Sequence, residues 1–89
     1  MHIKRQFFRD IVAKRKRVEY REIKPYWTNR LQGVRVPFFL RLINGMQPNA
    51  PEVTLVVESL RRRSGSYELH LGRIKDVKNW DRRREEPTD

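Results

Sequence analysis

Apolar side chains near the N-terminus recur with the period of a helix. Phe7 and Ile11 stand four residues apart, and so do Phe8 and Val12. Side chains at this spacing share one face of an α-helix. The pattern therefore predicts a helix over residues 6–15 whose apolar stripe faces a core.

The rest of the chain carries the patterns of short strands separated by turn residues. Val18 and Tyr20 alternate with charged neighbours, which predicts a half-buried strand with these two side chains on its core face. Pro25 suits the first turn of a short second helix, because proline lacks the donor that would stay unpaired there. The expected strands cover residues 17–23, 37–43, 52–60 and 67–71, and the expected second helix covers residues 25–31.

This order of elements indicates one small α+β domain. The strands concentrate in the second half, and no strand–helix–strand unit is long enough to build a parallel sheet. A small, mostly antiparallel β-barrel with an N-terminal helix and a short second helix fits best. Val77 and Trp80 are the last expected core residues, so we expect a domain over residues 1–80 and a charged, disordered tail over residues 81–89.

The net charge of the chain indicates what kind of partner it binds. The 89 residues include 21 Lys and Arg against 11 Asp and Glu, a formal net charge of +10. Residues 1–35 hold 11 of the basic residues and 3 of the acidic ones, which concentrates the positive field in this part of the chain. Such a field favours nucleic acid, either RNA or DNA, with an acidic protein partner as an alternative.

Several function classes are excluded by composition. The chain has no cysteine, which excludes disulfide scaffolds, zinc ribbons and thiol nucleophiles. His2 and His70 stand apart and make no metal site, and no glycine-rich phosphate loop is present, so we expect neither metal nor cofactor. No apolar run approaches the roughly 18 residues of a membrane span, and no signal-peptide pattern is seen. We expect a cytoplasmic domain without a membrane partner.

The connection between the predicted helix and the first strand carries the candidate chemistry. On a strand Arg17, Glu19 and Arg21 share a face, and Lys16 at the junction of helix and strand lies close enough to join them. Arginine binds phosphate or a base edge while glutamate accepts from an exocyclic amine, although a carboxylate between two arginines also makes a plain ion-pair network. Aromatic residues among cations suit single-stranded nucleic acid, because bases stack on the rings. The candidate nucleic-acid-binding residues are Lys14, Arg15, Lys16, Arg17, Arg21, Lys24, Tyr26 and Arg30.

Catalysis at the same place would need an acid/base pair. Lys16 and Glu19 are the catalytic candidates. Glu58, which stands in an apolar strand, and Asn44, which opens an Asn-Gly turn, are candidates for lining the cleft. Tyr20 is expected in the core.

Four short motifs in order resemble the ASCH domain family of the PUA-like superfamily, in its small bacterial and phage form. They are Lys16-x-x-Glu19-x-Arg21, Lys-Pro-Tyr-Trp at 24–27, Asn44-Gly45, and Leu-His-Leu-Gly-Arg-Ile at 69–74. The resemblance covers residues 2–75. It implies a PUA-like β-barrel with a cleft beside the first helix, into which the lysine, glutamate and arginine point, and it implies RNA binding.

The same resemblance implies two kinds of chemistry. One branch of the family consists of amidohydrolases that remove the acetyl group from acetylated cytidine, and other members are described as ribonucleases. Lys16 matches the lysine of the amidohydrolases, and Glu19 stands where they carry a threonine. The resemblance thus implies an RNA-binding or nucleotide-binding domain, with a metal-independent ribonuclease or an amidohydrolase as the alternative.

Overall fold

A long antiparallel hairpin organises the fold. The computed structural model describes residues 1–22, 24, 31 and 33–88. The hairpin consists of β3 (Glu52–Arg63) and β4 (Ser66–Lys78), which are joined by a turn at Ser64 and Gly65. Gly65 has a positive φ of 86°, which glycine adopts without strain. The elements are α1 (Arg5–Val12), β1 (Val18–Glu22), β2 (Phe38–Ile43), β3 (Glu52–Arg63), β4 (Ser66–Lys78), β5 (Trp80–Asp81) and β6 (Glu86–Pro87).

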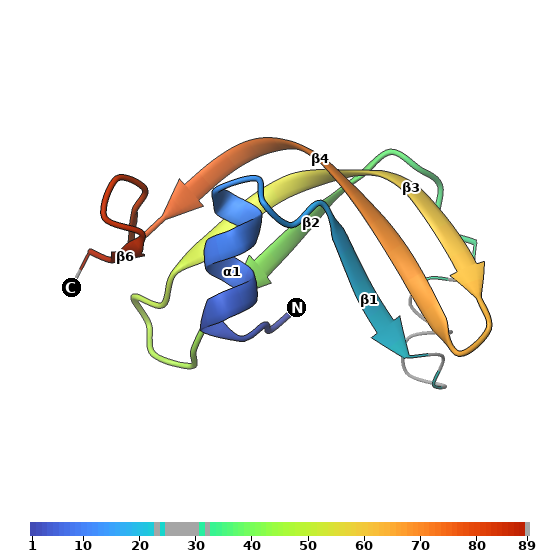
Figure 1. The fold of residues 1–89 in the computed structure, drawn as a ribbon, viewed down its shortest axis with the longest axis horizontal. Helices are drawn as coiled ribbons and strands as arrows, with labels where there is room; N and C mark the ends of the chain where they lie inside the picture. The colour runs from blue at the N-terminus through green and yellow to red at the C-terminus, as the bar shows by residue number, and fades with distance from the viewer. Residues whose placement is uncertain (23, 25–30, 32, 89) are drawn as a thin grey trace.

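The hairpin is widened by one strand at each edge, in the order β1-β4-β3-β2. β1 pairs with the turn-proximal half of β4, whereas β2 pairs with the opposite half of β3. Three register shifts between Thr54 and Ser59 interrupt the pairing of β3 with β4. Such irregularities bend and twist a sheet, and the result is the curled sheet of Figure 1.

The curled sheet is a half-barrel. All pairings among the named strands are antiparallel, as expected, and His2 adds one parallel bridge to Ile43. In the described part of the chain β1 and β2 remain at opposite edges of the four-stranded sheet and do not pair with each other. The small α+β class is therefore confirmed, whereas the described strands do not form the closed barrel that we expected.

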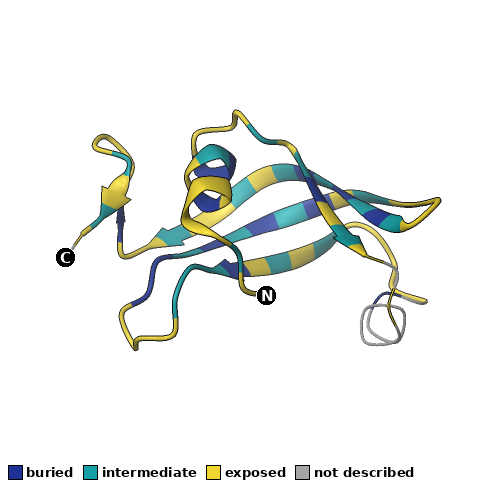
Figure 2. Ribbon diagram, turned by 60° about the horizontal axis from the view of Figure 1, so that its bottom comes forward, coloured by how far each residue is buried: buried dark blue, intermediate teal, exposed yellow. Residues whose placement is uncertain are grey.

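The core lies between α1 and one face of the sheet (Figures 1 and 2). Phe8, Ile11 and Val12 are buried on the helix, as the four-residue spacing predicts, but Phe7 is exposed. The sheet contributes apolar side chains from alternate positions, since successive residues of a strand point to opposite faces. These are Leu42, Val53, Leu55, Val57, Tyr67, Leu69 and Leu71.

The segment after β4 forms a short hairpin of β5 and β6, within the residues where we expected a charged tail. Trp80 is buried and its ring meets that of Phe8 edge to face, with the centroids 5.0 Å apart. Asp81 Oδ1 accepts hydrogen bonds from the backbone N–H groups of Arg83 and Arg84, which closes the turn between β5 and β6. The aromatic contact and this turn connect the segment to the rest of the fold.

The second helix expected over residues 25–31 lies outside the described residues except for Leu31. In the part that the structure describes, no helix has the length and apolar character needed to span a membrane.

Candidate nucleic-acid interface

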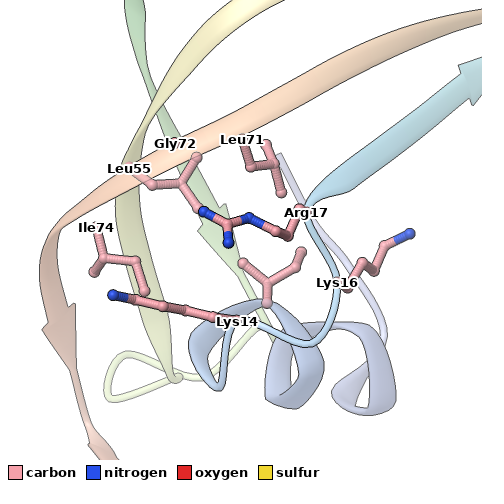
Figure 3. A pocket seen from close by; sticks show the side chains of 8 residues that line it. Lys14, Lys16, Arg17, Leu55, Leu71, Gly72 and Ile74 are labelled. Atoms are coloured by element: carbon pink, nitrogen blue, oxygen red, sulfur yellow. The ribbon is translucent and has the colours of Figure 1, made fainter.

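The basic residues that connect α1 to β1 point to two different sides. Lys14 adopts a left-handed conformation, with φ 65°, and the backbone N–H groups of Arg15 and Lys16 both donate to the carbonyl of Asp10. This arrangement satisfies carbonyl groups at the helix end and reverses the chain. Lys14 and Arg17 then point towards Gly72 and Ile74, whereas Lys16 points the other way (Figure 3).

The space between Lys14, Arg17 and β4 is too small for a ligand. Its volume is about 10 Å³, which is roughly what one water molecule requires. Arg17 also contributes to the sheet, because its carbonyl accepts a hydrogen bond from the backbone N–H of Leu71 at 2.8 Å. The Arg17 side chain points towards Gly72 and Ile74 (Figure 3), so it does not join Glu19 and Arg21 on one strand face as the alternation suggested.

β1 turns a carboxylate inward. Glu19 is 6% exposed and Tyr20 is 54% exposed, so the expected core position of Tyr20 is wrong. The register explains the inversion, because Glu19 lies opposite the buried Leu69 of β4. A buried carboxylate needs compensating partners. Its oxygens meet two cations, with Lys16 Nζ at 3.9 Å and Arg21 Nη2 at 3.5 Å, and the backbone N–H of Tyr20 donates to it at 3.0 Å.

Lys16 is held by aromatic rings as well as by the carboxylate. Its Nζ lies 5.1 Å from the ring centroid of Phe7 and 5.3 Å from that of Tyr20. Both distances suit attraction between a cation and the negative face of a ring. Phe7 and Tyr20 nevertheless expose much of their surface, so each ring keeps area for another flat group.

These residues border an open groove between the N-terminal segment and β1. Its volume is about 420 Å³, within the size range of small-molecule sites. Arg21 fixes one wall, because its Nη2 donates to the carbonyl of His2 at 3.1 Å. The lining residues are His2, Ile3, Lys4, Phe7, Glu19, Tyr20 and Arg21.

The structure thus brings together the three residues of the proposed motif, Lys16, Glu19 and Arg21. It adds four groove residues that sequence reasoning missed, namely His2, Ile3, Lys4 and Phe7. The signal for the N-terminal residues was absent, because their position depends on the bridge from His2 to Ile43 of β2, 41 residues further along the chain. For Phe7 the helical spacing pointed to the core.

The other basic candidates lie elsewhere. Arg15 binds Glu85 and Asp10, and these hydrogen bonds, that to Glu85 first, raise the pKa of Arg15 above its ordinary value. Lys24 makes an exposed ion pair with Glu22 at 3.2 Å. Tyr26 and Arg30 lie outside the described residues.

The two cleft-lining candidates do not border this groove. The side-chain amide of Asn44 donates to the carbonyl of Ile3, and its oxygen accepts from Arg5, so Asn44 fastens the N-terminal segment to the end of β2. Glu58 borders a different pocket, together with Phe39 and Arg73, and is not among the residues around Lys16.

The arrangement offers two exposed rings, several cations and one acceptor. Bases can stack on rings, phosphates pair with cations, and a carboxylate accepts from amino groups of a base. The described residues contain no group of three His, Cys, Asp or Glu side chains that could hold a metal ion. Comparison of the chain with protein-family models, curated proteins and solved structures finds no match.

Proposed function

We propose that this protein binds single-stranded RNA in the groove between its N-terminal segment and β1. One observation carries the proposal. The Lys16 ammonium lies over two aromatic rings, those of Phe7 and Tyr20, which are both exposed beside an open groove. Rings and cations in one place supply the stacking and the phosphate pairing that single strands need.

Charge supports a polyanion as the partner. The chain has a net charge of +10, and Lys4, Lys16 and Arg21 approach the groove from two segments of the chain. Glu19 reduces the local charge, but as a fixed acceptor it also gives the groove a means to distinguish bases that carry amino groups. The groove therefore combines general affinity with one point of selectivity.

The family relationship belongs to the same proposal. A helix, a basic connection and a strand that carry Lys16, Glu19 and Arg21 in this order resemble the ASCH domains, and a cleft beside the first helix is what that resemblance implies. The position of the groove beside α1 supports this relationship. The sheet is a half-barrel and not a closed barrel, so its shape gives this relationship no further support.

A titration of fluorescently labelled single-stranded RNA, followed by anisotropy, tests the proposal. With three phosphates contacted, the affinity falls with salt at a logarithmic slope of about −2, which is nearly twentyfold between 50 and 200 mM salt. Lys4→Gln is expected to make the slope less steep by about 0.7, since one phosphate contact is lost. Tyr20→Ala lowers the affinity roughly fivefold to a hundredfold and leaves the slope unchanged, because stacking releases no counterions.

A matched variant separates the groove from charge in general. Arg84→Gln removes one cation from the β5–β6 hairpin and is expected to change affinity less than Lys4→Gln does. Equal losses in the two variants would show that the whole basic surface binds RNA and that the groove does not. A DNA strand of the same sequence serves as the comparison for RNA preference.

Hydrolysis of RNA or of a modified nucleoside such as acetylated cytidine is the second candidate. It is favoured by the approach of Lys16 Nζ to the buried Glu19 carboxylate, 3.9 Å, at the groove wall. Product formation measured in the binding samples tests this candidate. Turnover that disappears in both Lys16→Ala and Glu19→Gln would support it, and binding without product would leave RNA recognition as the function.

A further inference from the structure

We infer that a second pocket, on the face of the sheet turned away from α1, binds a guanine nucleotide. Pro37, Phe38, Phe39, Val56, Glu58 and Arg73 line this pocket, whose volume is about 350 Å³. The inference does not depend on RNA binding in the groove, because none of these residues borders that groove.

Strand alternation places the pocket away from the core. Leu55 and Val57 are buried under α1, so Val56 between them faces the other side. Ile74 packs against the core, and its neighbour Arg73 is exposed. Phe39 lies opposite Val56 in the register and is 56% exposed. The pocket thus has an apolar floor with an open aromatic ring.

The Glu58 side chain lies against β4 at Gly72, where the strand carries no side chain. Gly72 stands in the middle of the strand, where glycine is otherwise unfavourable. A Cβ atom at position 72 would collide with the Oε1, Cδ and Cγ atoms of Glu58. The absence of a side chain at Gly72 therefore makes room for the Glu58 carboxyl group against the sheet.

The charged groups at the pocket are available to a ligand. Within the described part of the chain neither Glu58 nor Arg73 makes an ion pair. Lys75 adds a further cation, with its Nζ 4.4 Å from the ring centroid of Phe39. A carboxylate and two cations around an aromatic wall match a ligand that has both N–H donors and a negative charge.

Guanine fits this combination better than the other bases. Its Watson–Crick edge presents two adjacent N–H donors, N1–H and N2–H, which match the two oxygens of a carboxylate. The corresponding edges of adenine, cytosine and uracil each present a single N–H donor, so they offer a carboxylate one hydrogen bond at most. With the base against Phe39 and its edge at Glu58, the phosphate is bound by the guanidinium of Arg73.

Backbone amide NMR shifts during titration with GMP and AMP test the inference. We expect GMP to shift the amides of residues 39, 56, 58 and 73 and to bind at least about tenfold more tightly than AMP, as a bidentate base contact provides. The pentamers UUGUU and UUAUU form a second arm, which distinguishes a free nucleotide from an unpaired base of RNA as the source of guanine.

Two variants identify the groups involved. Glu58→Gln replaces one acceptor by a donor, so the preference for GMP over AMP is expected to fall about tenfold while AMP affinity stays the same. Glu22→Gln, which removes the same charge from the exposed end of β1, serves as its control. Arg73→Ala is expected to weaken GMP binding without affecting guanosine, and Arg62→Ala on β3 is the matched control.

Clear results would overturn the inference. The first is equal affinity for guanine and adenine in both arms of the experiment. The second is amide shifts confined to other residues, and the third is a guanine preference that survives Glu58→Gln.

The two sites can also be told apart. GMP binding that persists in Tyr20→Ala, with RNA binding lost, would show that the two sites are independent. If the groove binds RNA but the outer pocket does not bind guanine, this inference is wrong and the proposed function still stands.

Discussion

The buried carboxylate of Glu19 gives a strong test of the electrostatic reasoning, through the substitution Glu19→Gln. The amide keeps the size of the side chain but removes its charge, so Lys16 and Arg21 no longer face the Glu19 carboxylate. Their side chains are only 21% and 22% exposed, so water compensates for this loss in part. The same strand carries a matched control in the exposed pair of Glu22 and Lys24, which is closer at 3.2 Å.

The magnitude follows from burial rather than from distance. In an effective dielectric constant of about 20, each contact of Glu19 amounts to roughly 4 kcal/mol before desolvation. Desolvation offsets most of this gain, but removing the carboxylate takes a negative charge away from two partly buried cations, and we expect a loss of about 2 kcal/mol. The Glu22 side chain is 75% exposed, and its pair with Lys24 contributes below about 0.5 kcal/mol after screening and side-chain entropy.

Thermal unfolding followed by circular dichroism measures the difference. For a domain of this size, about 2 kcal/mol corresponds to a fall in Tm of roughly 8–16 °C. We expect that fall for Glu19→Gln and a change of about 4 °C or less for Glu22→Gln. If Glu22→Gln lowers Tm as much as Glu19→Gln, or if Glu19→Gln leaves Tm unchanged, the assignment of Glu19 as a buried ion-pair centre is wrong.

Three further substitutions test other parts of the fold. Lys14→Gly is expected to be more stable than Lys14→Ala by about 1 kcal/mol in urea unfolding, because glycine alone adopts a φ of 65° without strain; equal stabilities would contradict the left-handed conformation. Trp80→Ala removes the edge-to-face contact with Phe8 and is expected to cost about 3 kcal/mol by the same measurement, whereas a cost below about 1 kcal/mol would mean that the C-terminal hairpin does not anchor the core. The hydrogen bonds from Arg41 lower the pKa of Glu52 below its ordinary value of 4.5, so Glu52 adds stability above that pH that is lost as the pH falls through the lowered pKa. Arg41→Ala is therefore expected to flatten the dependence of stability on pH below about pH 5, and to lower the stability at pH 7 by less than about 1 kcal/mol. An unchanged pH profile would rule out this pair as a source of acid sensitivity.

The sequence predicted the elements better than the faces they present. Four-residue spacing correctly placed Phe8 against the core, because local periodicity determines which side of a helix is apolar. For β1 the same reasoning failed, since it assumes that the apolar side of a strand faces inward. Glu19 faces inward instead because Lys16 and Arg21 compensate its charge, and the motif that links these three residues was the available signal.

Contacts between distant parts of the chain account for what the sequence did not predict. We expected a disordered tail over residues 81–89 because this segment is rich in charged residues. In the fold Arg15 reaches Glu85 across 70 positions, and Trp80 reaches the helix. The groove likewise depends on His2 pairing with Ile43. No pattern within one segment reports such pairings, so the N-terminal wall of the groove could not be foreseen.

Mapping of single-stranded RNA onto the protein by backbone amide NMR shifts tests the central proposal most directly. We expect the shifts to concentrate in residues 2–7 and 16–21, which form the two walls of the groove, and to weaken in Tyr20→Ala. The proposal would be contradicted if the shifts gathered on the β3–β4 turn or the C-terminal hairpin, or if RNA produced no shifts at all.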